Sequence, residues 1–544
     1  MSCGYYISGW RRAVTRVGGV RRRGAAAPAG GRFATIGPRA GTRTAPHGSR
    51  RARSWRPPTR REEAPAPAGK AVDIGSGNVR GGCIGGGGDD RGRDGPPDGG
   101  DRGPGGRPGR EDARPAAPLE QPNLVAPVDV PALSPRLWVL VAATGVLAGL
   151  AGSALMLLLE ATSALAYGHR SGDLLTAVEE AGPGRRVLVL AAAGVLAGAG
   201  WWLLARWTGP GGSEVSTALW RDRGRLPMRR SLGTAFLSTV IVGMGASLGR
   251  EAAPRLAGAA LASRLSDRAG IDTAHRRLLA ACGAGAGMAC VYNVPLGGAL
   301  LTLEVMLGVL SLRLALPALA ACCIATGVSW IVLPTGPTYQ LPEVPLSGSL
   351  TVFALVIGPL AGLAAVGWVR MIRVAHRHRP TGRGLLIAPA LVFTGVGLLA
   401  IPFPELLGNG KDIVDLALGA QLAVPAVLVL LLLKPLVTAG SLGSGASGGL
   451  FTPTIVIGAL LGALAGRGWA QLWDAPAAGF AVLGAAAVLA AAMQAPLAAV
   501  VLMLELTRTT DALTVPLILA VTGAILVSRA LDTPSLYSVR LPAQ

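Results

Sequence analysis

Long apolar runs follow one another from about residue 133 almost to the end of this 544-residue chain, and they limit what it can fold into. Only 15% of all residues are charged, while 51% are hydrophobic. Four runs are long enough to cross a bilayer, at 137–159, 187–205, 314–333 and 422–440. The sequence therefore predicts an all-α polytopic membrane domain over residues 133–540.

Residues 1–132 have a very different composition from the apolar part. They consist mainly of Gly, Pro, Ala and Arg, as in "GGCIGGGGDDRGRDGPPDGG". A segment with so few core-forming side chains cannot offset the entropy that ordering costs, so it is predicted to be a disordered tail. The first ten residues contain no apolar stretch typical of a cleavable signal peptide.

The formal net charge is +21, and basic residues also cluster between the apolar runs, at 221–230, 275–277 and 370–383. Basic loops beside membrane helices mark the cytoplasmic side. We therefore expect these loops and the tail to face the cytoplasm at the plasma (cell inner) membrane. A solvated basic arm near anionic membrane lipid is favoured over nucleic-acid binding.

The apolar part contains an internal repeat. The segment "GAGAGMACVYNVPLGGALLTLEVM" aligns with "GAAAVLAAAMQAPLAAVVLMLELT", so that Pro295 and Glu304 fall on Pro496 and Glu505 at a constant offset of 201 residues. The segments "GREAAP" and "GGLFTP" share a Gly followed five residues later by Pro, at an offset of 199. Two ordered blocks at nearly one offset indicate a duplication.

The duplication predicts two homologous halves, roughly residues 133–335 and 349–540. Internal repeats are typical of transporters, whose sites lie at the repeat interface near the middle of the membrane. Some apolar segments, such as "STVIVGMGASLG" and "FTPTIVIGALLGALAG", read as short and interrupted by Gly or Pro. We therefore expect re-entrant, broken helices.

Three junctions rich in Gly and Pro precede helix-compatible stretches: "TGPGGSEVSTAL", "GASLGREAAPRLAG" and "GSLGSGASGGLFTPTIVIGALLG". Pro254 and Pro453 would lie in the first helical turn, where a missing N–H costs nothing. Free amides and positive dipole ends of such helices attract an anion. With no lysine nearby, the anion would be held weakly enough to leave. The alternative is that these glycines only permit close helix packing.

From about Leu133 onward the chain resembles the CLC family of chloride channels and chloride/proton antiporters. "GREAAP" is similar to the family's GREGP, "GSGASGGLFTP" to its GSGxxGGxFxP, "YNVPLGGALLTLE" to its FNAPLAGxLFxxE, and "SLYS" to its PLYS. The motifs occur in the family's order. The resemblance implies that the two halves are inverted relative to each other, and that the protein is a homodimer with a separate anion path in each subunit. Because only seven residues follow Tyr537, we expect the bacterial type without CBS domains.

The resemblance also implies the functional residues. Glu251 would be the gate, because its charged carboxylate would occupy an anion position at the helix ends and its protonated form would swing away. The residues implied at the anion path are Pro210, Gly211, Arg250, Ala252, Leu450, Phe451 and Tyr537. Of these, Leu450 and Phe451 would offer backbone amides and Tyr537 a hydroxyl to a chloride, nitrate or other small monovalent anion.

Two positions depart from the family pattern. Pro210 stands where the family's GSGIP motif has a serine, which leaves the preferred anion open. Val305 stands where the antiporters carry their internal proton acceptor, and valine cannot carry a proton. Glu304 is the candidate substitute, although its repeat partner Glu505 favours a structural role, capping or pairing, for both carboxylates. Proton-coupled exchange and passive conductance therefore both remain open.

Functions from other classes fit less well. The stretch "GASG" resembles the GxSG of intramembrane serine proteases, but none of the five histidines lies in an apolar run after Ser447 to act as its base. A non-CLC transporter for a larger organic substrate would carry more aromatic residues than the 4% present. No enzyme activity, metal or cofactor is predicted, and the six cysteines are assigned to core packing.

Overall fold

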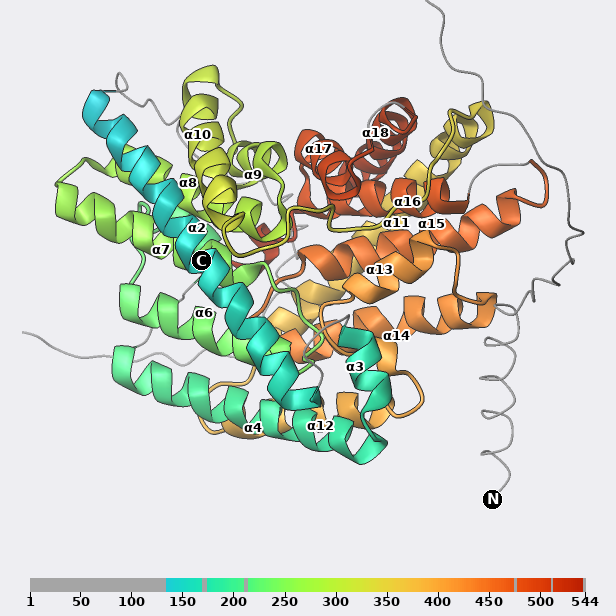
Figure 1. Cartoon of the computed structure of the whole chain (residues 1–544), viewed down its shortest axis with the longest axis horizontal. Helices are drawn as coiled ribbons and strands as arrows, with labels where there is room; N and C mark the ends of the chain where they lie inside the picture. Colours follow the sequence, from blue (N-terminus) through green and yellow to red (C-terminus); the bar gives the residue numbers. More distant parts are fainter. Residues whose placement is uncertain (1–133, 169–173, 210–213, 474–476, 510–511, 542–544) are drawn as a thin grey trace, which may run out of the picture. The chain divides into compact units, whose positions relative to one another are not determined.

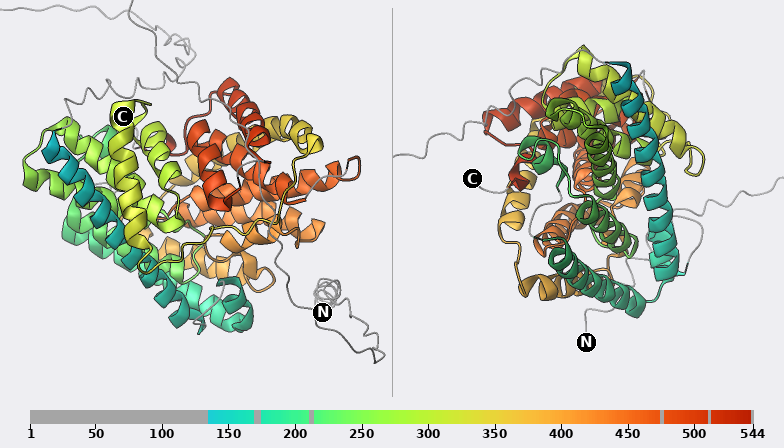
Figure 2. Two further views of the ribbon diagram at one scale, coloured as in Figure 1. Left: turned by 45° about the horizontal axis from the view of Figure 1, so that its top comes forward. Right: turned by 90° about the vertical axis from the view of Figure 1, so that its left-hand side faces the viewer.

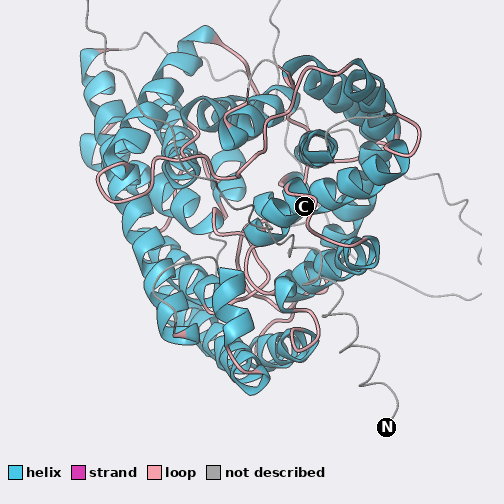
Figure 3. Cartoon of the chain, turned by 45° about the vertical axis from the view of Figure 1, so that its right-hand side comes forward, coloured by secondary structure: helices cyan, strands magenta, loops and turns pink. Residues whose placement is uncertain are grey.

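A computed structural model describes residues 134–168, 174–209, 214–473, 477–509 and 512–541. Within these ranges the secondary structure is helical, with loops between the helices and one isolated backbone bridge (Figure 3). The predicted tail, 1–132, lies outside the described residues. The elements of the first half are α2 (Pro135–Tyr167), α3 (Leu174–Glu180), α4 (Pro183–Thr208), α5 (Val215–Trp220), α6 (Met228–Gly243), α7 (Ala252–Ala269), α8 (Thr273–Tyr292), α9 (Pro295–Leu301), η1 (Thr302–Leu307) and α10 (Leu312–Ser329).

The second half has a similar order of helices, without a counterpart of α3 between its first two helices. It consists of α11 (Gly348–Arg377), α12 (Gly384–Leu399), η2 (Pro404–Leu406), α13 (Lys411–Leu418), α14 (Val424–Gly443), α15 (Phe451–Trp469), α16 (Ala477–Met493), α17 (Pro496–Thr507), α18 (Thr514–Ala530) and η3 (Ser538–Arg540). Figure 1 shows the first half, in blue to yellow-green, on one side and most of the second half, in orange to red, on the other. The two halves meet where α4 packs against α12 and α9 against α17.

Local sequence explains where equivalent helices of the two halves begin and end. The side chains of Ser134 and Ser347 cap the long first helices α2 and α11 by accepting a backbone N–H three residues on. Gly245 and Gly445, 200 residues apart, both have positive φ (97° and 106°) directly after α6 and α14. Because glycine adopts this conformation without a steric penalty, both helices stop at the same point of the repeat.

Glycines also allow helices to pack closely against each other. This agrees with the alternative considered for the Gly-rich junctions, that their glycines permit close helix packing. A Cβ on Gly258 of α7 would collide with the carbonyl oxygen of Gly283 in α8, and the reverse holds as well. Gly458 of α15 and Gly484 of α16 form the same reciprocal contact in the second half. Small residues therefore bring equivalent helix pairs together in both halves. Figure 2 shows the ribbon of the packed helices from two further sides.

Six described helices are long and apolar enough to cross a membrane: α2, α4, α10, α11, α14 and α15. The runs at 137–159 and 187–205 fall within α2 and α4, and most of each run at 314–333 and 422–440 falls within α10 and α14, which confirms those predictions. The expectation that "FTPTIVIGALLGALAG" is short and interrupted is wrong, since α15 continues unbroken for 19 residues. Its glycines face the neighbouring helix α16 instead of breaking the helix. By contrast, α6 does end at Gly243, inside "STVIVGMGASLG".

Candidate functional site

Two glycine-rich turns, one from each half, meet at the centre of the described fold. Gly249 and Gly449 form an isolated antiparallel bridge, in which each backbone N–H donates to the other's carbonyl oxygen at 2.8 and 2.9 Å. The helices α7 and α15 begin two or three residues later, at Ala252 and Phe451. Pro254 and Pro453 are each the third residue of their helix, so both lie in the first turn as predicted.

Glu251, just before α7, directs its carboxylate to the start of the other half's helix. The backbone N–H of Phe451 donates to Glu251 Oε1 at 2.7 Å. The side chain is fully buried, with 0% of its surface exposed. Because Phe451 is the first residue of the 19-residue helix α15, the carboxylate lies at a positive dipole end with a free amide. Such a position also suits a small anion.

The two bridging glycines leave room for this carboxylate. A Cβ on Gly249 would lie 2.7 Å from Glu251 Cδ. A Cβ on Gly449 would overlap the carboxylate even more closely, and its three nearest neighbours would all be Glu251 carboxyl atoms. Glycine is therefore needed at these two positions because the Glu251 carboxylate approaches the backbone closely. The space for the carboxylate matters more here than the backbone conformation that glycine allows.

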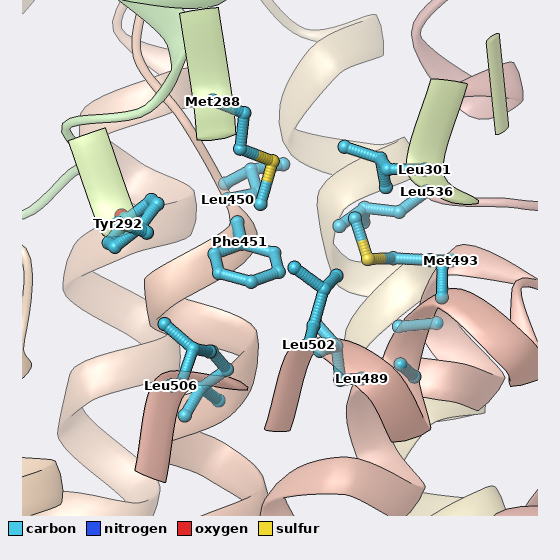
Figure 4. Close-up of a cluster of buried hydrophobic side chains, with 14 of the residues drawn as sticks. Met288, Tyr292, Leu301, Leu450, Phe451, Leu489, Met493, Leu502, Leu506 and Leu536 are labelled. Atoms are coloured by element: carbon cyan, nitrogen blue, oxygen red, sulfur yellow. The ribbon is translucent and has the colours of Figure 1, made fainter. Parts of the chain in front are cut away.

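Phe451 also anchors the site in the apolar core. Figure 4 shows its ring between side chains from α8 and α17, among them Met288, Tyr292 and Leu502. The Phe451 and Tyr292 ring centroids are 5.4 Å apart at an angle of 49°. The start of α15 is thus fixed by packing on several sides, which holds its first amide toward Glu251.

Tyr292, the last residue of α8, is a functional residue that sequence reasoning missed. Its hydroxyl donates to Glu251 Oε2 at 3.2 Å and lies 2.7 Å from Thr452 Oγ1. The Glu251 carboxylate therefore has one donor on each oxygen. Only one difference in the sequence pointed to Tyr292. "YNVPLGG" has a tyrosine where the similar motif FNAPLAG has a phenylalanine, so this chain has an additional hydroxyl group at that position.

Replacing Tyr292 with phenylalanine should weaken the hold on the carboxylate. A hydrogen bond to a charged group contributes about 1.5 kcal/mol or more, so the variant should show roughly 10-fold faster anion flux at neutral pH. Flux from liposomes containing the purified protein measures this. Tyr339→Phe is the matched control, because Tyr339 is equally buried and its hydroxyl has no partner among the described residues. Equal flux in the two variants would contradict a role for the Tyr292 hydroxyl.

The other residues predicted at the anion path take different positions. Arg250 stacks over Tyr292, with Cζ 5.0 Å from the ring centroid, and forms no ion pair with Glu251 within the described residues. Leu450 is the residue before α15, and the amide that reaches Glu251 belongs to Phe451 instead. Ala252 begins α7 and lines a small cavity. Pro210 and Gly211 lie outside the described residues.

The C-terminal segment places Tyr537 in this region. Ser535 Oγ donates to the carbonyl oxygen of Met493 at 2.9 Å, and the Leu536 N–H donates to that of Ala492 at 2.8 Å. These bonds attach the segment to the end of α16. Tyr537 is thereby buried, with 6% of its surface exposed, and lines a cavity of about 50 Å³ together with Ala252 and Ser447. The described residues that line this cavity include no histidine.

Comparison with known proteins identifies the fold and the protein family. Residues 193–529 match the sequence profile of the voltage-gated chloride channel family. The chain belongs to the CLC family. The voltage-gated ClC-type chloride channel ClcB of Escherichia coli is 32% identical over 395 residues, which cover 70% of this chain and 92% of ClcB. A ClcB-like protein of Ralstonia nicotianae is 33% identical over 366 residues, covering 65% of this chain and 84% of its own length.

Solved structures show the same fold at lower identity. A slow cyanobacterial Cl⁻/H⁺ antiporter superposes with a TM-score of 0.66 at 23% identity, covering 75% of this chain and 97% of the antiporter. A CLC-type fluoride/proton antiporter gives a TM-score of 0.61, also at 23% identity, over 74% of this chain and 97% of its own. The predicted all-α, polytopic CLC fold is thus confirmed, and the chain is an integral membrane protein of an anion-transporting family.

In this CLC chain, Glu304 and its repeat partner Glu505 each cap a helix of the other half. Glu304 accepts the backbone N–H groups of Leu497 and Ala498 at 3.2 and 2.6 Å, at the start of α17. Glu505 accepts the corresponding N–H groups at the start of α9, at 3.0 and 2.7 Å. The sequence favoured capping for both carboxylates, and the geometry agrees. Val305, next to Glu304, is 5% exposed.

Replacing Glu304 with glutamine should therefore affect stability. A glutamine has one acceptor oxygen, so one backbone N–H at the start of α17 loses its hydrogen-bond partner. This should lower the free energy of unfolding by about 2 kcal/mol. Glu505→Gln should cause an equal loss, measured by thermal unfolding of the purified protein. Glu343→Gln, at an exposed loop position, is the control. Unchanged stability together with lost proton movement would instead indicate that Glu304 carries protons.

Proposed function

We propose that this CLC chain moves small monovalent anions across the membrane along a path that the charged Glu251 carboxylate closes. The observation that carries the proposal is the 2.7 Å hydrogen bond from the Phe451 N–H to Glu251 Oε1. A helix N-terminus with a free amide binds an inorganic anion and a carboxylate by the same interactions. The carboxylate and the transported anion therefore compete for one position.

Protonation would release the gate. A neutral carboxylic acid gains less than a carboxylate from a dipole end and from two donors, so an anion replaces it more readily. Two residues hold the charged form here, Phe451 through its amide and Tyr292 through its hydroxyl. Anion flux should then increase as pH falls.

We favour passive flux over proton exchange. Val305 has no titratable group, and both oxygens of Glu304 accept backbone N–H groups of α17. Proton-coupled exchange is the second candidate, supported by Glu214, a carboxylate that lines the cavity beside Tyr537. Glu214 is paired with Arg540 at 2.5 Å.

The remaining proposals concern placement and assembly. The basic loops at 221–230, 275–277 and 370–383 support a cytoplasmic orientation at the plasma membrane. Exposed apolar side chains on α9 and α17, including Leu296 and Leu497 at 51% each, support a homodimer through that face. Chloride and nitrate are the proposed anions, and each subunit would have its own path.

One experiment tests the function and separates the two candidates. The purified full chain is placed in liposomes, a chloride or nitrate gradient is imposed, and anion flux is recorded together with internal pH. Anion flux without uphill proton movement supports the passive path. Proton movement driven by the anion gradient would establish exchange. No anion flux at any pH would contradict the proposed function itself.

A further inference from the structure

A cavity separate from the anion path lies between two loops that we expect to face the cytoplasm. It measures about 200 Å³ and is formed by the turn between α5 and α6 together with the start of α8. Most of its lining residues are arginines. The lining residues are Arg221, Asp222, Arg223, Arg225, Thr273 and Arg276. The cavity beside Tyr537 shares none of them.

The turn that carries three of these arginines has a strained backbone and is held firmly in place. Arg223 has a φ of 54°, in the left-handed region that residues with a side chain rarely adopt, and Gly224 follows with 78°. The Gly224 N–H donates to the Ala218 carbonyl oxygen at 2.8 Å. A Cβ on Gly224 would lie 2.8 Å from Arg277 Cα. Close contacts with α5 and α8 therefore keep the turn in this conformation despite its cost.

The cavity has more positive than negative charge. Among the described residues, none of the three arginines of the turn forms an ion pair. Arg276, of which 8% is exposed, pairs through its Nε with Asp267 at 3.1 Å. Asp222 is the one acidic residue in the lining. Like charges held close together repel each other, so an anion in the cavity would relieve the repulsion among the arginines.

The size of the cavity indicates which anion it suits. A space of about 200 Å³ holds several water molecules. It is smaller than the roughly 300 Å³ or more of pockets that enclose a whole organic ligand. A phosphate group has a charge of nearly two and three strong acceptor oxygens, and each guanidinium can donate two parallel N–H bonds to it. A single phosphate or a diphosphate therefore matches both the volume and the excess charge.

We propose that the turn between α5 and α6 and the start of α8 form a binding site for a phosphate group. The phosphate belongs either to a soluble compound, such as a diphosphate, or to the headgroup of a membrane lipid. The chemistry that recognises it is the same in both cases. The site has no residue in common with the gate or the anion path, so the proposal does not depend on transport.

Calorimetric titration of sodium pyrophosphate into the purified full chain in detergent tests for a soluble ligand. The buffer contains about 0.15 M sodium chloride, so that chloride is in excess at the anion path and weak surface attraction is screened. We expect the wild type to bind pyrophosphate saturably. Arg223→Gly should weaken this binding roughly 10-fold, because it removes a guanidinium that bonds the phosphate.

Two readouts show whether the loss is specific. Glycine adopts the left-handed conformation without a steric penalty, so Arg223→Gly should unfold at about the same temperature as the wild type. Arg229→Gln removes the same charge from an exposed position of α6 beside the turn, and it should bind pyrophosphate like the wild type. Equal weakening in the two variants would mean that binding follows overall charge, and it would overturn the site.

A lipid arm tests the other source of the phosphate. The full chain is placed in nanodiscs of phosphatidylcholine with a small share of phosphatidic acid, and the lipid that stays bound is measured by native mass spectrometry. Preferential retention of phosphatidic acid that Arg223→Gly loses would identify a headgroup site. Pyrophosphate binding without such retention would identify a soluble phosphate compound. The inference is overturned if the wild type binds in neither arm, or if Arg223→Gly behaves like the wild type in both.

Discussion

Replacing Glu251 with glutamine should make anion flux nearly independent of pH. In the wild-type protein, flux should be roughly 10-fold or more higher at acidic than at neutral pH, because protonation releases the carboxylate. Glutamine is neutral throughout, so the amide of Phe451 remains open to anions at every pH. Flux of the variant at neutral pH should match or exceed that of the wild type at acidic pH.

The matched control is Glu160→Gln, which removes one carboxylate from an exposed position of α2. It should keep the pH dependence of the wild type. If Glu251→Gln also keeps it, another group gates the path and the assignment of Glu251 fails. Flux is measured from liposomes at equal protein content, with the internal and external pH set together.

Gly449→Ala should displace the Glu251 carboxylate from its position without replacing Glu251 itself. The three atoms nearest to the added methyl group would all belong to the Glu251 carboxyl group. Overpacking of this kind costs about 1–3 kcal/mol, so the variant should be less stable, and its flux should lose pH dependence. Gly327→Ala in α10 is the control, because a methyl group there meets no atom within 4 Å.

A double variant identifies the cause of that effect. In a Glu251→Ala background the colliding carboxylate is absent, so Gly449→Ala should cost little further stability. The two substitutions should therefore show a coupling of about 1–3 kcal/mol in unfolding measurements. Additive costs would mean that Gly449 is required by the backbone itself, and that the carboxylate does not occupy the described position.

The sequence predicted that Glu251 and Phe451 belong to one site, but it did not predict the geometry of that site. The duplication and the CLC motifs are enough to assign Glu251 and Phe451 to one site. They could not show that Gly249 and Gly449 pair directly, because a backbone bridge between two turns leaves no pattern in a sequence. Neither could they show that the charge of Arg250 is directed at the Tyr292 ring, since the direction depends on packing of α8.

Tyr292 and Arg255 show which features of the site the sequence did not reveal. Tyr292 stands where the similar motif FNAPLAG has phenylalanine, so its hydroxyl is not part of the family pattern. Arg255 directly follows the "GREAAP" segment and belongs to none of the recognised motifs. Only the fold shows that Arg255 is 6% exposed and bonded to Tyr537.

The repeat was the more reliable guide for Glu304. Its alignment with Glu505 favoured capping in both halves, and each carboxylate accepts two N–H groups of the other half. Glycine content was a poor guide for α15, where glycines were expected to interrupt the helix. Glycines at helix contacts and glycines at helix ends have the same appearance in a sequence, and only the neighbouring helix distinguishes them.

The central claim is that Glu251 and the transported anion compete for the amide of Phe451. Calorimetric titration of chloride into the purified protein tests it most directly, at neutral and at acidic pH. We predict that the wild type binds chloride about 10-fold more tightly at acidic pH, whereas Glu251→Gln binds it equally tightly at both. Equal affinity in the two proteins at both pH values would contradict the claim.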